Sequence, residues 1–512
     1  MKLQRTLALS LAATSLAGTL AACSAGAATP APTATPAAEP SVQTLSSQTS
    51  PAQKAPKYVF LFIGDGMSYP QFQAASDYLG AMADTNNDDI LDGNVNLSFM
   101  DFPVAGSAVT YDSTSFCPDS ASTATSISTG YKTYSGTINM DETATVAYET
   151  IAEKLREQFG WKIGVISSVN LNPAAPAAFY AHQASRGNYY EIGEELVASG
   201  FEYFAGGGLL KPTGSAKDKT SLYDLAAQSG YQVVMTQAEA EAVTAGPVLI
   251  IDEHLADSDA MAYELDRTDD MWSLADYVKK GIQVLDNDKG FFMMCEGGKI
   301  DWACHANDAA ASIHDTLALA DAVQVAIDFA KDHAEETLIL VTGDHETGGL
   351  SIGFAGTDYD TYLSQLNSQT ISYAKYDSDY VAAYKANKTP FETVLKDIET
   401  LFGLKVNGEA GDRLVLTDYE LGLLKTAYEK SVNEKDTGMA DQEEYVAYGT
   451  YEPLSVTITH ILNNKSGISF TSYSHTGLPV AVFADGVNAE LFKGYYDNTA
   501  IYDKLAQMLA VR

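Results

Sequence analysis

Three times along this chain, a short apolar stretch with the character of a strand runs directly into side chains that can bind metal ions. The three junctions are Tyr58–Ile63 before Gly64-Asp65-Gly66, Phe291–Cys295 before Glu296-Gly297-Gly298, and Leu338–Val341 before Thr342-Gly343-Asp344-His345. In an open parallel α/β sheet, ligands bind just beyond the carboxyl ends of the strands. We therefore expect these side chains to meet at one edge of such a sheet. Three acids and a histidine together suit hard or borderline cations.

A fourth segment, residues 118–130, places a serine at the start of a helix. Asp119 or Ser120 would cap the helix, and Gly130 would stop it. The N-terminus of a helix is its positive end and attracts anions. A nearby divalent cation would lower the pKa of the Ser120 hydroxyl further and make it a nucleophile without a histidine base. An ordinary capping serine is the alternative, because such caps are common. The three metal-ligating strand ends favour the nucleophile.

Two further histidines add to the predicted metal site. If a helix begins near Asp301, its i,i+4 spacing places Asp301 and His305 on one face, although such pairs also arise by chance. His475 precedes another strand-like stretch, Leu478–Phe483. With the strand-end acids, these residues favour a metal-dependent hydrolase.

The N-terminal 56 residues have a different composition from the rest of the 512-residue chain. Residues 1–22 form a basic and then apolar segment that is typical of an export signal. It ends in Leu20-Ala21-Ala22-Cys23, which resembles a bacterial lipobox; a chance cysteine at the cleavage site is the alternative. Residues 23–56, mostly Ala, Pro, Thr, Ser and Gln, predict a disordered tether. No later stretch reaches the ~18 apolar residues of a transmembrane helix. We expect an exported protein that is lipid-anchored through Cys23 to the extracytoplasmic face of a bacterial membrane.

Residues 57–512 are predicted to form one large α/β domain, because the strand-end motifs extend from Asp65 to beyond Asp344. The expected fold is a three-layer α/β/α sandwich around a large, mostly parallel sheet. Inserted segments, largely helical in the second case, are expected at about 205–270 and 355–470.

The formal net charge is −36, from 67 acidic and 31 basic side chains. This balance argues against nucleic acid as a partner, which requires a basic surface. A local cluster of cations would have to attract any anionic substrate against the overall field. The spacing of Cys295 and Cys304 matches no zinc motif, and we expect these two cysteines and Cys117 to be free thiols.

As a set, the motifs of this chain resemble those of the alkaline phosphatases over roughly residues 57–353 and 470–512. The matching segments are Phe62-Ile63-Gly64-Asp65-Gly66-Met67, Asp119-Ser120-Ala121, Gly206-Gly207-Gly208, Glu296-Gly297-Gly298 with Ile300-Asp301 and His305, Thr342-Gly343-Asp344-His345, and His475-Thr476-Gly477. The resemblance implies an exported enzyme that hydrolyses small phosphate monoesters through a phosphoseryl intermediate at a two-zinc site and releases inorganic phosphate. It also implies a homodimer, because members of the family are often dimers.

The resemblance also implies a role for each matching residue. One zinc ion would be held by Asp301, His305 and His475, and the other by Asp65, Asp344 and His345, with Ser120 beside it. Asp65 and Glu296 would share a third, magnesium position. Arg186 matches the family's phosphate-binding arginine, whose planar fork suits two phosphate oxygens, and Asp119 would steady it. His182 is interpreted as structural.

This chain departs from the family pattern at the third metal position. Ala175 stands where the family has a hydroxyl ligand for magnesium, and Pro173 replaces its neighbour. Trp302 also stands where many members have Lys or His. We expect a weak magnesium site beside a complete two-zinc site, unless Asn170 or Asn172 supplies the missing oxygen.

Two other functions compete with this interpretation. A sulfatase would need an arginine four residues after its reactive Cys or Ser, and neither Cys117 nor Ser120 has one. A phosphodiesterase would commonly have Thr at the position of Ser120 and would lack Arg186. A binding protein that kept the fold and lost activity would have lost the nucleophile or metal ligands, and the sequence retains them all.

Overall fold

The computed structural model describes residues 55–84, 91–433 and 441–512. The predicted signal segment and Cys23 lie outside the described residues, as does the predicted tether up to residue 54. Contacts gather residues 53–512 into one compact unit. None of the helices in the described ranges is both long enough and apolar enough to cross a bilayer.

A ten-stranded sheet forms the centre of this unit, with the strand order β14-β2-β13-β8-β1-β7-β3-β4-β6-β5. Only β13 runs antiparallel to its neighbours, β8 and β2, so the sheet is mostly parallel, as predicted. The strands are β1 Tyr58–Gly64, β2 Val104–Val109, β3 Lys162–Ser167, β4 Tyr203–Gly206, β5 Gln232–Val234, β6 Val248–Ile251, β7 Phe291–Gly297, β8 Thr337–Gly343, β13 Val480–Gly486 and β14 Gly494–Asp497.

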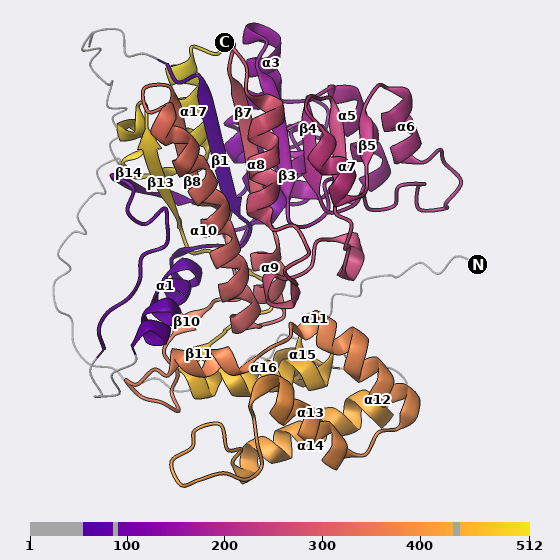
Figure 1. Cartoon of the computed structure of the whole chain (residues 1–512), viewed down its shortest axis with the longest axis vertical. Helices are drawn as coiled ribbons and strands as arrows, with labels where there is room; N and C mark the ends of the chain where they lie inside the picture. Colours follow the sequence, from indigo (N-terminus) through magenta and orange to yellow (C-terminus); the bar gives the residue numbers. More distant parts are fainter. Residues whose placement is uncertain (1–54, 85–90, 434–440) are drawn as a thin grey trace, which may run out of the picture. The chain divides into compact units, whose positions relative to one another are not determined.

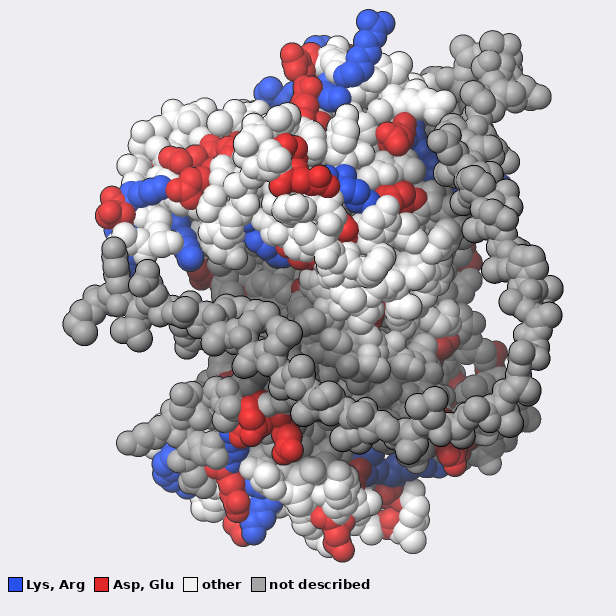
Figure 2. Space-filling view, turned by 180° about the vertical axis from the view of Figure 1, so that it is seen from behind, with Lys and Arg blue, Asp and Glu red and all other residues white. Residues whose placement is uncertain are grey.

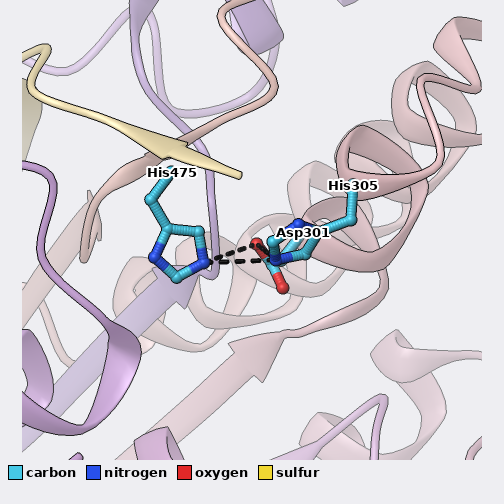
Figure 3. Close-up of side chains that lie close together, drawn as sticks. All are labelled: Asp301, His305 and His475. Atoms are coloured by element: carbon cyan, nitrogen blue, oxygen red, sulfur yellow. Dashed lines mark hydrogen bonds and ion pairs between the residues drawn. The ribbon is translucent and has the colours of Figure 1, made fainter. Parts of the chain in front are cut away.

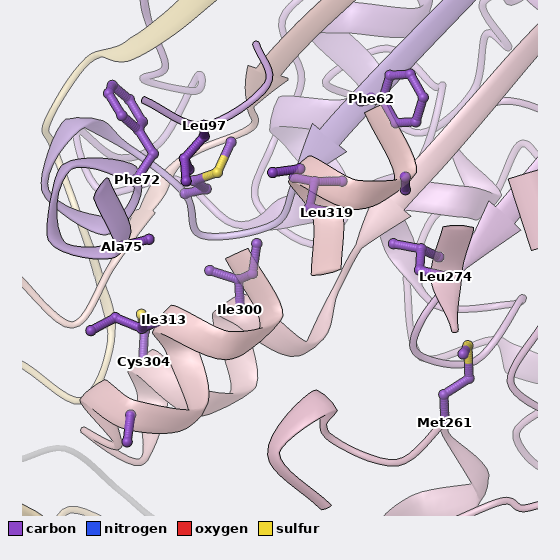
Figure 4. Close-up of a cluster of buried hydrophobic side chains, with 14 of the residues drawn as sticks. Phe62, Phe72, Ala75, Leu97, Met261, Leu274, Ile300, Cys304, Ile313 and Leu319 are labelled. Carbon is purple, nitrogen blue, oxygen red and sulfur yellow. The ribbon is translucent and has the colours of Figure 1, made fainter. Parts of the chain in front are cut away.

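Helices cover both faces of the sheet, which confirms the predicted three-layer sandwich (Figure 1). Successive side chains of a strand point to opposite faces. Phe60 and Phe62 of β1 therefore join one buried cluster, while Leu61 and Ile63 join another. Figure 4 shows part of the first cluster, where Phe62 and Leu319 lie near the central strands. That face is covered by α1 Tyr69–Ala83, α8 Leu274–Leu285 and α10 Ala309–Asp332, and the other by α2 Ser120–Thr129, α3 Ile151–Phe159, α4 Ala174–Ala177, α5 Tyr189–Ser199, α6 Leu222–Gln228 and α17 Thr499–Leu509.

Part of the first predicted insertion, residues 205–270, belongs to the sheet. After β4, the chain adds β6 and β5 to the sheet edge, with α7 Gln237–Ala242 between them in sequence. The sequence does not predict these strands, because Gln232–Val234 and Val248–Ile251 are too short to show a hydrophobic periodicity.

Residues 355–470 leave and re-enter the fold at adjacent positions. Strand β10 (Ser351–Ile352) pairs antiparallel with β11 (Ile468–Ser469), so the segment between them closes on itself. Next to this pair, β9 (Glu346–Thr347) pairs with β12 (His475–Thr476). The segment is largely helical, as its sequence predicts, and contains α11 Tyr373–Tyr376, the π-helical turn Asp377–Val381, α12 Ala382–Asn387, α13 Phe391–Phe402, α14 Asp418–Asn433, α15 Gln442–Tyr448 and α16 Pro453–Ser466.

Acidic and basic side chains are interspersed on the face of the molecule seen in Figure 2. The coloured part of that face carries no continuous basic surface. The three cysteines within the described ranges form no disulfide: Cys117 is exposed, and Cys295 and Cys304 are buried.

Gly343, at the end of β8, has no room for a side chain. A Cβ atom there would lie 1.9 Å from the backbone oxygen of Met67. The loop after β1 therefore packs directly on the end of β8.

We predict that Gly343→Ala lowers the free energy of unfolding by about 1–3 kcal/mol, because the backbone must shift to admit the methyl group. Gly422→Ala in α14 is the matched control: no atom lies within 4 Å of its added Cβ. The control should leave stability unchanged or raise it by up to about 1 kcal/mol, since alanine favours a helix interior. Urea unfolding measures both, and equal effects of the two substitutions would contradict the packing argument.

Candidate metal centre and nucleophile

The three strand-end motifs meet because β1, β7 and β8 are neighbours in register. Gly64 at the end of β1 lies opposite Gly297 of β7 on one side and Gly343 of β8 on the other. The acids Asp65, Glu296 and Asp344 therefore emerge at one edge of the sheet. This convergence is the one that the sequence predicts.

Asp65, Asp344 and His345 form a buried cluster, the Asp65 triad. One ligand atom from each lies within 4.8 Å of the others. The His345 Nε2 atom is 3.2 Å from Asp65 Oδ1 and 3.3 Å from Asp344 Oδ2. The backbone N–H groups of Gly66 and His345 donate to Asp344 Oδ1 and fix that carboxylate.

Asp301, His305 and His475 form a second cluster, the Asp301 triad, whose ligand atoms also lie within 4.8 Å of one another. Asp301 and His305 lie one turn apart in α9 (Lys299–His305), as their spacing predicts. Figure 3 shows the two imidazole rings and the carboxylate converging from α9 and β12. Asp301 Oδ1 is 3.3 Å from His305 Nε2 and 3.6 Å from His475 Nε2.

The two histidines of the Asp301 triad are oriented as metal ligands. The Nδ1–H groups of His305 and His475 donate to the backbone oxygens of Tyr473 and Pro118, each at 2.6 Å. In a neutral imidazole this leaves Nε2 with a lone pair. The two Nε2 atoms face each other at 3.2 Å. Although burial opposes it, the charge of Asp301 raises the pKa of His305 to about 9, so the His305 Nε2–H can donate to His475 Nε2; a bound cation would take the place of that proton. Nδ1 hydrogen bonds of this kind are typical of metal-bound histidines.

The buried acids at the strand ends also fit a cation. Burial and the neighbouring carboxylates raise the pKa of Asp65 well above its usual value. Burial, together with the charge of Asp301, raises the pKa of Asp344 to about 7, and burial with the charge of Asp344 raises that of Glu296 to about 8. Carboxyl groups packed this closely hold protons unless positive charge takes their place. The residues of this edge therefore fit bound divalent cations.

Ser120 lies at the Asp65 triad. Its Oγ atom is 3.0 Å from His345 Nε2 and 3.4 Å from Asp65 Oδ1. Ser120 is the first residue of α2, and the Asp119 side chain caps that helix by accepting from the Ser122 N–H. Gly130 ends the helix in the left-handed conformation, as predicted. The serine thus stands at the positive end of a helix and beside a metal-ligand cluster.

Asp119 connects the start of α2 to Arg186. Its Oδ2 atom accepts from the Arg186 guanidinium and from the Gly136 N–H, at 3.0 Å and 2.9 Å. Arg186 is only partly buried, so its remaining N–H groups stay available to an anion.

His182 belongs to neither triad. It forms ion pairs from within the segment that leads to Arg186. Its ring lies between Glu153 and Glu195, with N···O distances of 3.4 Å and 3.5 Å. Although burial opposes it, these two carboxylates raise the pKa of His182 to about 10.

At Glu296 the structure brings in a residue that the sequence analysis missed. The Ser167 hydroxyl, at the end of β3, donates to Glu296 Oε2. Ala175 lies in α4 and is buried without a polar side chain. Asn172 is engaged elsewhere, because its amide binds the backbone of Tyr189 and Leu210. Ser167, at the end of the apolar stretch Lys162–Ser167, belongs to no recognisable sequence motif. Its contact with Glu296 follows only from the pairing of β3 with β7.

Two more supporting contacts could not be read from a motif. The Thr347 hydroxyl donates to Asp301 Oδ1 at 2.5 Å and lies 3.3 Å from His345 Nδ1, so it touches both triads. Asn307 donates to the backbone oxygens of Cys304 and Ser472, and it contacts His460 of α16 at 3.0 Å. The helical segment thereby supports Asn307, which connects the end of α9, where His305 lies, to the loop before His475.

Comparison with known proteins agrees with this geometry. The family model described as alkaline phosphatase matches residues 56–511. Alkaline phosphatase 3 of Bacillus subtilis (strain 168) is 31% identical over 454 residues, which cover 87% of this chain and 87% of the relative.

Solved structures show the same similarity. The cold-active alkaline phosphatase of Shewanella sp. has a TM-score of 0.71 and 28% identity, and the match covers 89% of this chain and 100% of that one. The alkaline phosphatase of Thermus thermophilus has a TM-score of 0.72 over 90% of this chain and 93% of its own; at 22% identity it supports the fold alone.

Proposed function

This chain belongs to the alkaline phosphatase family and hydrolyses phosphate monoesters, and on this premise we propose that it does so through a phosphoseryl intermediate on Ser120 at a two-zinc site. The observation that carries the proposal is the position of Ser120, whose Oγ atom lies 3.0 Å from His345 Nε2 at the N-terminus of α2.

The two triads would each hold one zinc ion. Each offers imidazole nitrogen and carboxylate oxygen, which are ordinary zinc ligands, and leaves a further position for substrate. When bound, two divalent cations neutralise charge on the phosphoryl oxygens and lower the pKa of a neighbouring hydroxyl.

The side chains of this chain would then perform two displacements. Ser120 Oγ forms a bond to phosphorus while the ester oxygen leaves; water next cleaves the Oγ–phosphorus bond and releases inorganic phosphate. Arg186 would bind two oxygens of the phosphoryl group with its planar fork. Asp119 would hold Arg186 at the correct distance from Ser120, since it contacts the guanidinium and caps α2.

We predict that Ser120→Ala abolishes the covalent phosphoenzyme and leaves the zinc content unchanged. The control is Ser126→Ala in the same helix, whose hydroxyl only bonds the backbone oxygen of Ser122. Acid quenching after reaction with a labelled phosphate ester, followed by peptide mass spectrometry, measures the intermediate, and elemental analysis measures zinc. Phosphate trapped on a different residue of the wild-type enzyme would disprove the assignment.

Replacing Arg186 should weaken the binding of substrate and transition state without abolishing turnover. We predict that Arg186→Ser lowers kcat/KM by roughly 30- to 1000-fold, or about 2–4 kcal/mol, because a charge-assisted bidentate contact is lost. Inhibition by inorganic phosphate should weaken as well. Arg156→Ser, which removes a guanidinium near Glu202 instead, should change neither quantity. Unchanged kinetics and unchanged phosphate inhibition in Arg186→Ser would exclude Arg186 as the residue that binds the phosphoryl group.

We further propose a third site for magnesium, formed by Asp65 and Glu296, with Ser167 supplying the hydroxyl that Ala175 lacks. Asp65 and Glu296 interact, and Ser167 contacts Glu296 from β3. Two carboxylates and one hydroxyl suit an ion that prefers oxygen ligands and keeps several waters.

We predict that Ser167→Ala weakens magnesium binding to the zinc-loaded enzyme by about 10-fold or more, because a supporting oxygen is lost. Ala175→Thr should strengthen binding by restoring a second hydroxyl. Ser168→Ala is the control, since its hydroxyl accepts from the Lys299 N–H instead. Calorimetric titration with magnesium measures all three variants. Tight binding that neither Ser167→Ala nor Ala175→Thr alters would refute the proposal.

Export and a lipid anchor at Cys23 complete the proposal, with small phosphate monoesters as substrates and a second copy of this chain as a possible partner. We predict that Cys23→Ser moves the protein from the membrane fraction to the soluble fraction with unchanged kcat, while Ser24→Ala leaves it at the membrane. A chain that begins at Lys57 should be fully active. Membrane attachment that survives Cys23→Ser would contradict the lipid anchor. A truncated chain that fails to fold would contradict the assignment of the preceding residues as a dispensable tether.

A further inference from the structure

Arg186 is held through the backbone of Gly136 as well as through the side chain of Asp119. The Arg186 N–H donates to the Gly136 oxygen at 2.7 Å, and the Gly136 N–H donates to Asp119 Oδ2 at 2.9 Å. Gly136 therefore lies between the residue that would bind phosphate and the residue that caps α2. A shift of Gly136 would change the position of the guanidinium relative to Ser120.

Asp112, in the loop after β2, contacts both sides of this arrangement. Its Oδ2 atom accepts from the hydroxyl of Ser135, the residue before Gly136. The same oxygen accepts from the Ser122 hydroxyl, in the first turn of α2, at 2.8 Å. One carboxylate thus joins the loop that contains Gly136 to the helix that begins at the nucleophile.

The Ser122 hydroxyl also connects Asp112 to Asp119. It lies 2.8 Å from Asp112 Oδ2 and 2.9 Å from Asp119 Oδ1, so the two carboxylates share it. The Ser122 N–H donates to the same Asp119 oxygen at 3.1 Å. Two atoms of Ser122 therefore hold the carboxylate whose other oxygen binds Arg186.

Asp112 itself is held by its own loop and is only 4% exposed. Its Oδ1 atom accepts from the N–H groups of Thr114 and Ser115, each at 2.7 Å, and from the Thr114 hydroxyl at 2.8 Å. Although burial opposes it, these and the Oδ2 hydrogen bonds lower the pKa of this carboxyl group, so it is ionised at neutral pH. Both oxygens of Asp112 are thus acceptors with fixed donors.

We propose that Asp112 is a positioning residue for phosphate binding: it fixes Gly136 and the first turn of α2 so that Arg186 meets the phosphoryl group at Ser120. A guanidinium that binds two oxygens at once requires an accurate position, so small displacements weaken both contacts. The contacts of Asp112 with the site run through Ser122 and through the loop of Gly136. This inference rests on the proposed role of Arg186.

Ser135→Ala tests the proposal with little disturbance, because Ser135 is exposed and the substitution removes one hydroxyl. We expect kcat/KM to fall and the Ki of inorganic phosphate to rise, each about 3- to 30-fold, since a misplacement of 1 Å can cost roughly 100-fold. Zinc content and the urea midpoint should match the wild type. Ser113→Ala, next to Asp112, is the matched control and should change neither quantity, because its hydroxyl donates to Glu142 instead.

A double-mutant cycle separates positioning of Arg186 from a general structural effect. In the Arg186→Ser background, Ser135→Ala should change both quantities by less than about 2-fold, because the residue through which it acts is gone. Asp112→Asn replaces one acceptor oxygen with a donor. It should lower kcat/KM more than Ser135→Ala does and show the same dependence on Arg186. If Asp112→Asn fails to fold, the Ser135→Ala cycle decides alone.

The outcomes separate this inference from the function on which it rests. If Ser135→Ala changes neither quantity, or changes both by the same factor with and without Arg186, the inference fails and the proposed function stands. If Arg186→Ser itself leaves phosphate inhibition unchanged, the proposed role of Arg186 fails, and the inference fails with it. Phosphate inhibition requires no covalent intermediate, so this readout does not depend on the formation of phosphoserine.

Discussion

Electrostatic repulsion within one small buried volume is the constraint on which this structure depends. Four carboxylates, those of Asp65, Glu296, Asp301 and Asp344, are buried at the same sheet edge as three imidazoles. Without cations, burial and the neighbouring carboxylates raise the pKa values of Asp65, Asp344 and Glu296, and a proton lies between the Nε2 atoms of His305 and His475, which are 3.2 Å apart. Bound cations would take the place of these protons. The free energy of metal binding would therefore also stabilise the folded state.

The fold brings these groups together from distant parts of the chain. Parallel pairing of β7, β1 and β8 aligns three strand ends, and the antiparallel β13 enters the sheet from the same edge. His475 reaches the site because β12 pairs with β9 immediately after His345. The helical segment 355–470 is closed by the adjacent β10–β11 pair, so its long excursion leaves the geometry of the ligands intact. That segment instead contributes His460, whose ring contacts Asn307 behind the Asp301 triad.

The sequence predicts the parts of the site that depend on local pattern. The apolar runs before Asp65, Glu296 and Asp344, and the helix from Ser120 to Gly130, follow from hydrophobic stretches, capping and glycine chemistry, and the structure has them where expected. The roles of Ser167 and Thr347 depend on which strands and loops become neighbours. The last two strands at one end of the sheet, β6 and β5, were missed for a related reason: they are too short for periodicity to identify them. The contacts and strands that the sequence does not predict are those that depend on long-range pairing, which no local pattern encodes.

Anomalous diffraction at the zinc absorption edge, from crystals of the purified enzyme, tests the central claim most directly. The account predicts two strong zinc peaks per chain, one bound by Asp301, His305 and His475 and the other by Asp65, Asp344 and His345, with Ser120 Oγ closer to the second. A single peak, or zinc bound away from these two triads, would contradict it.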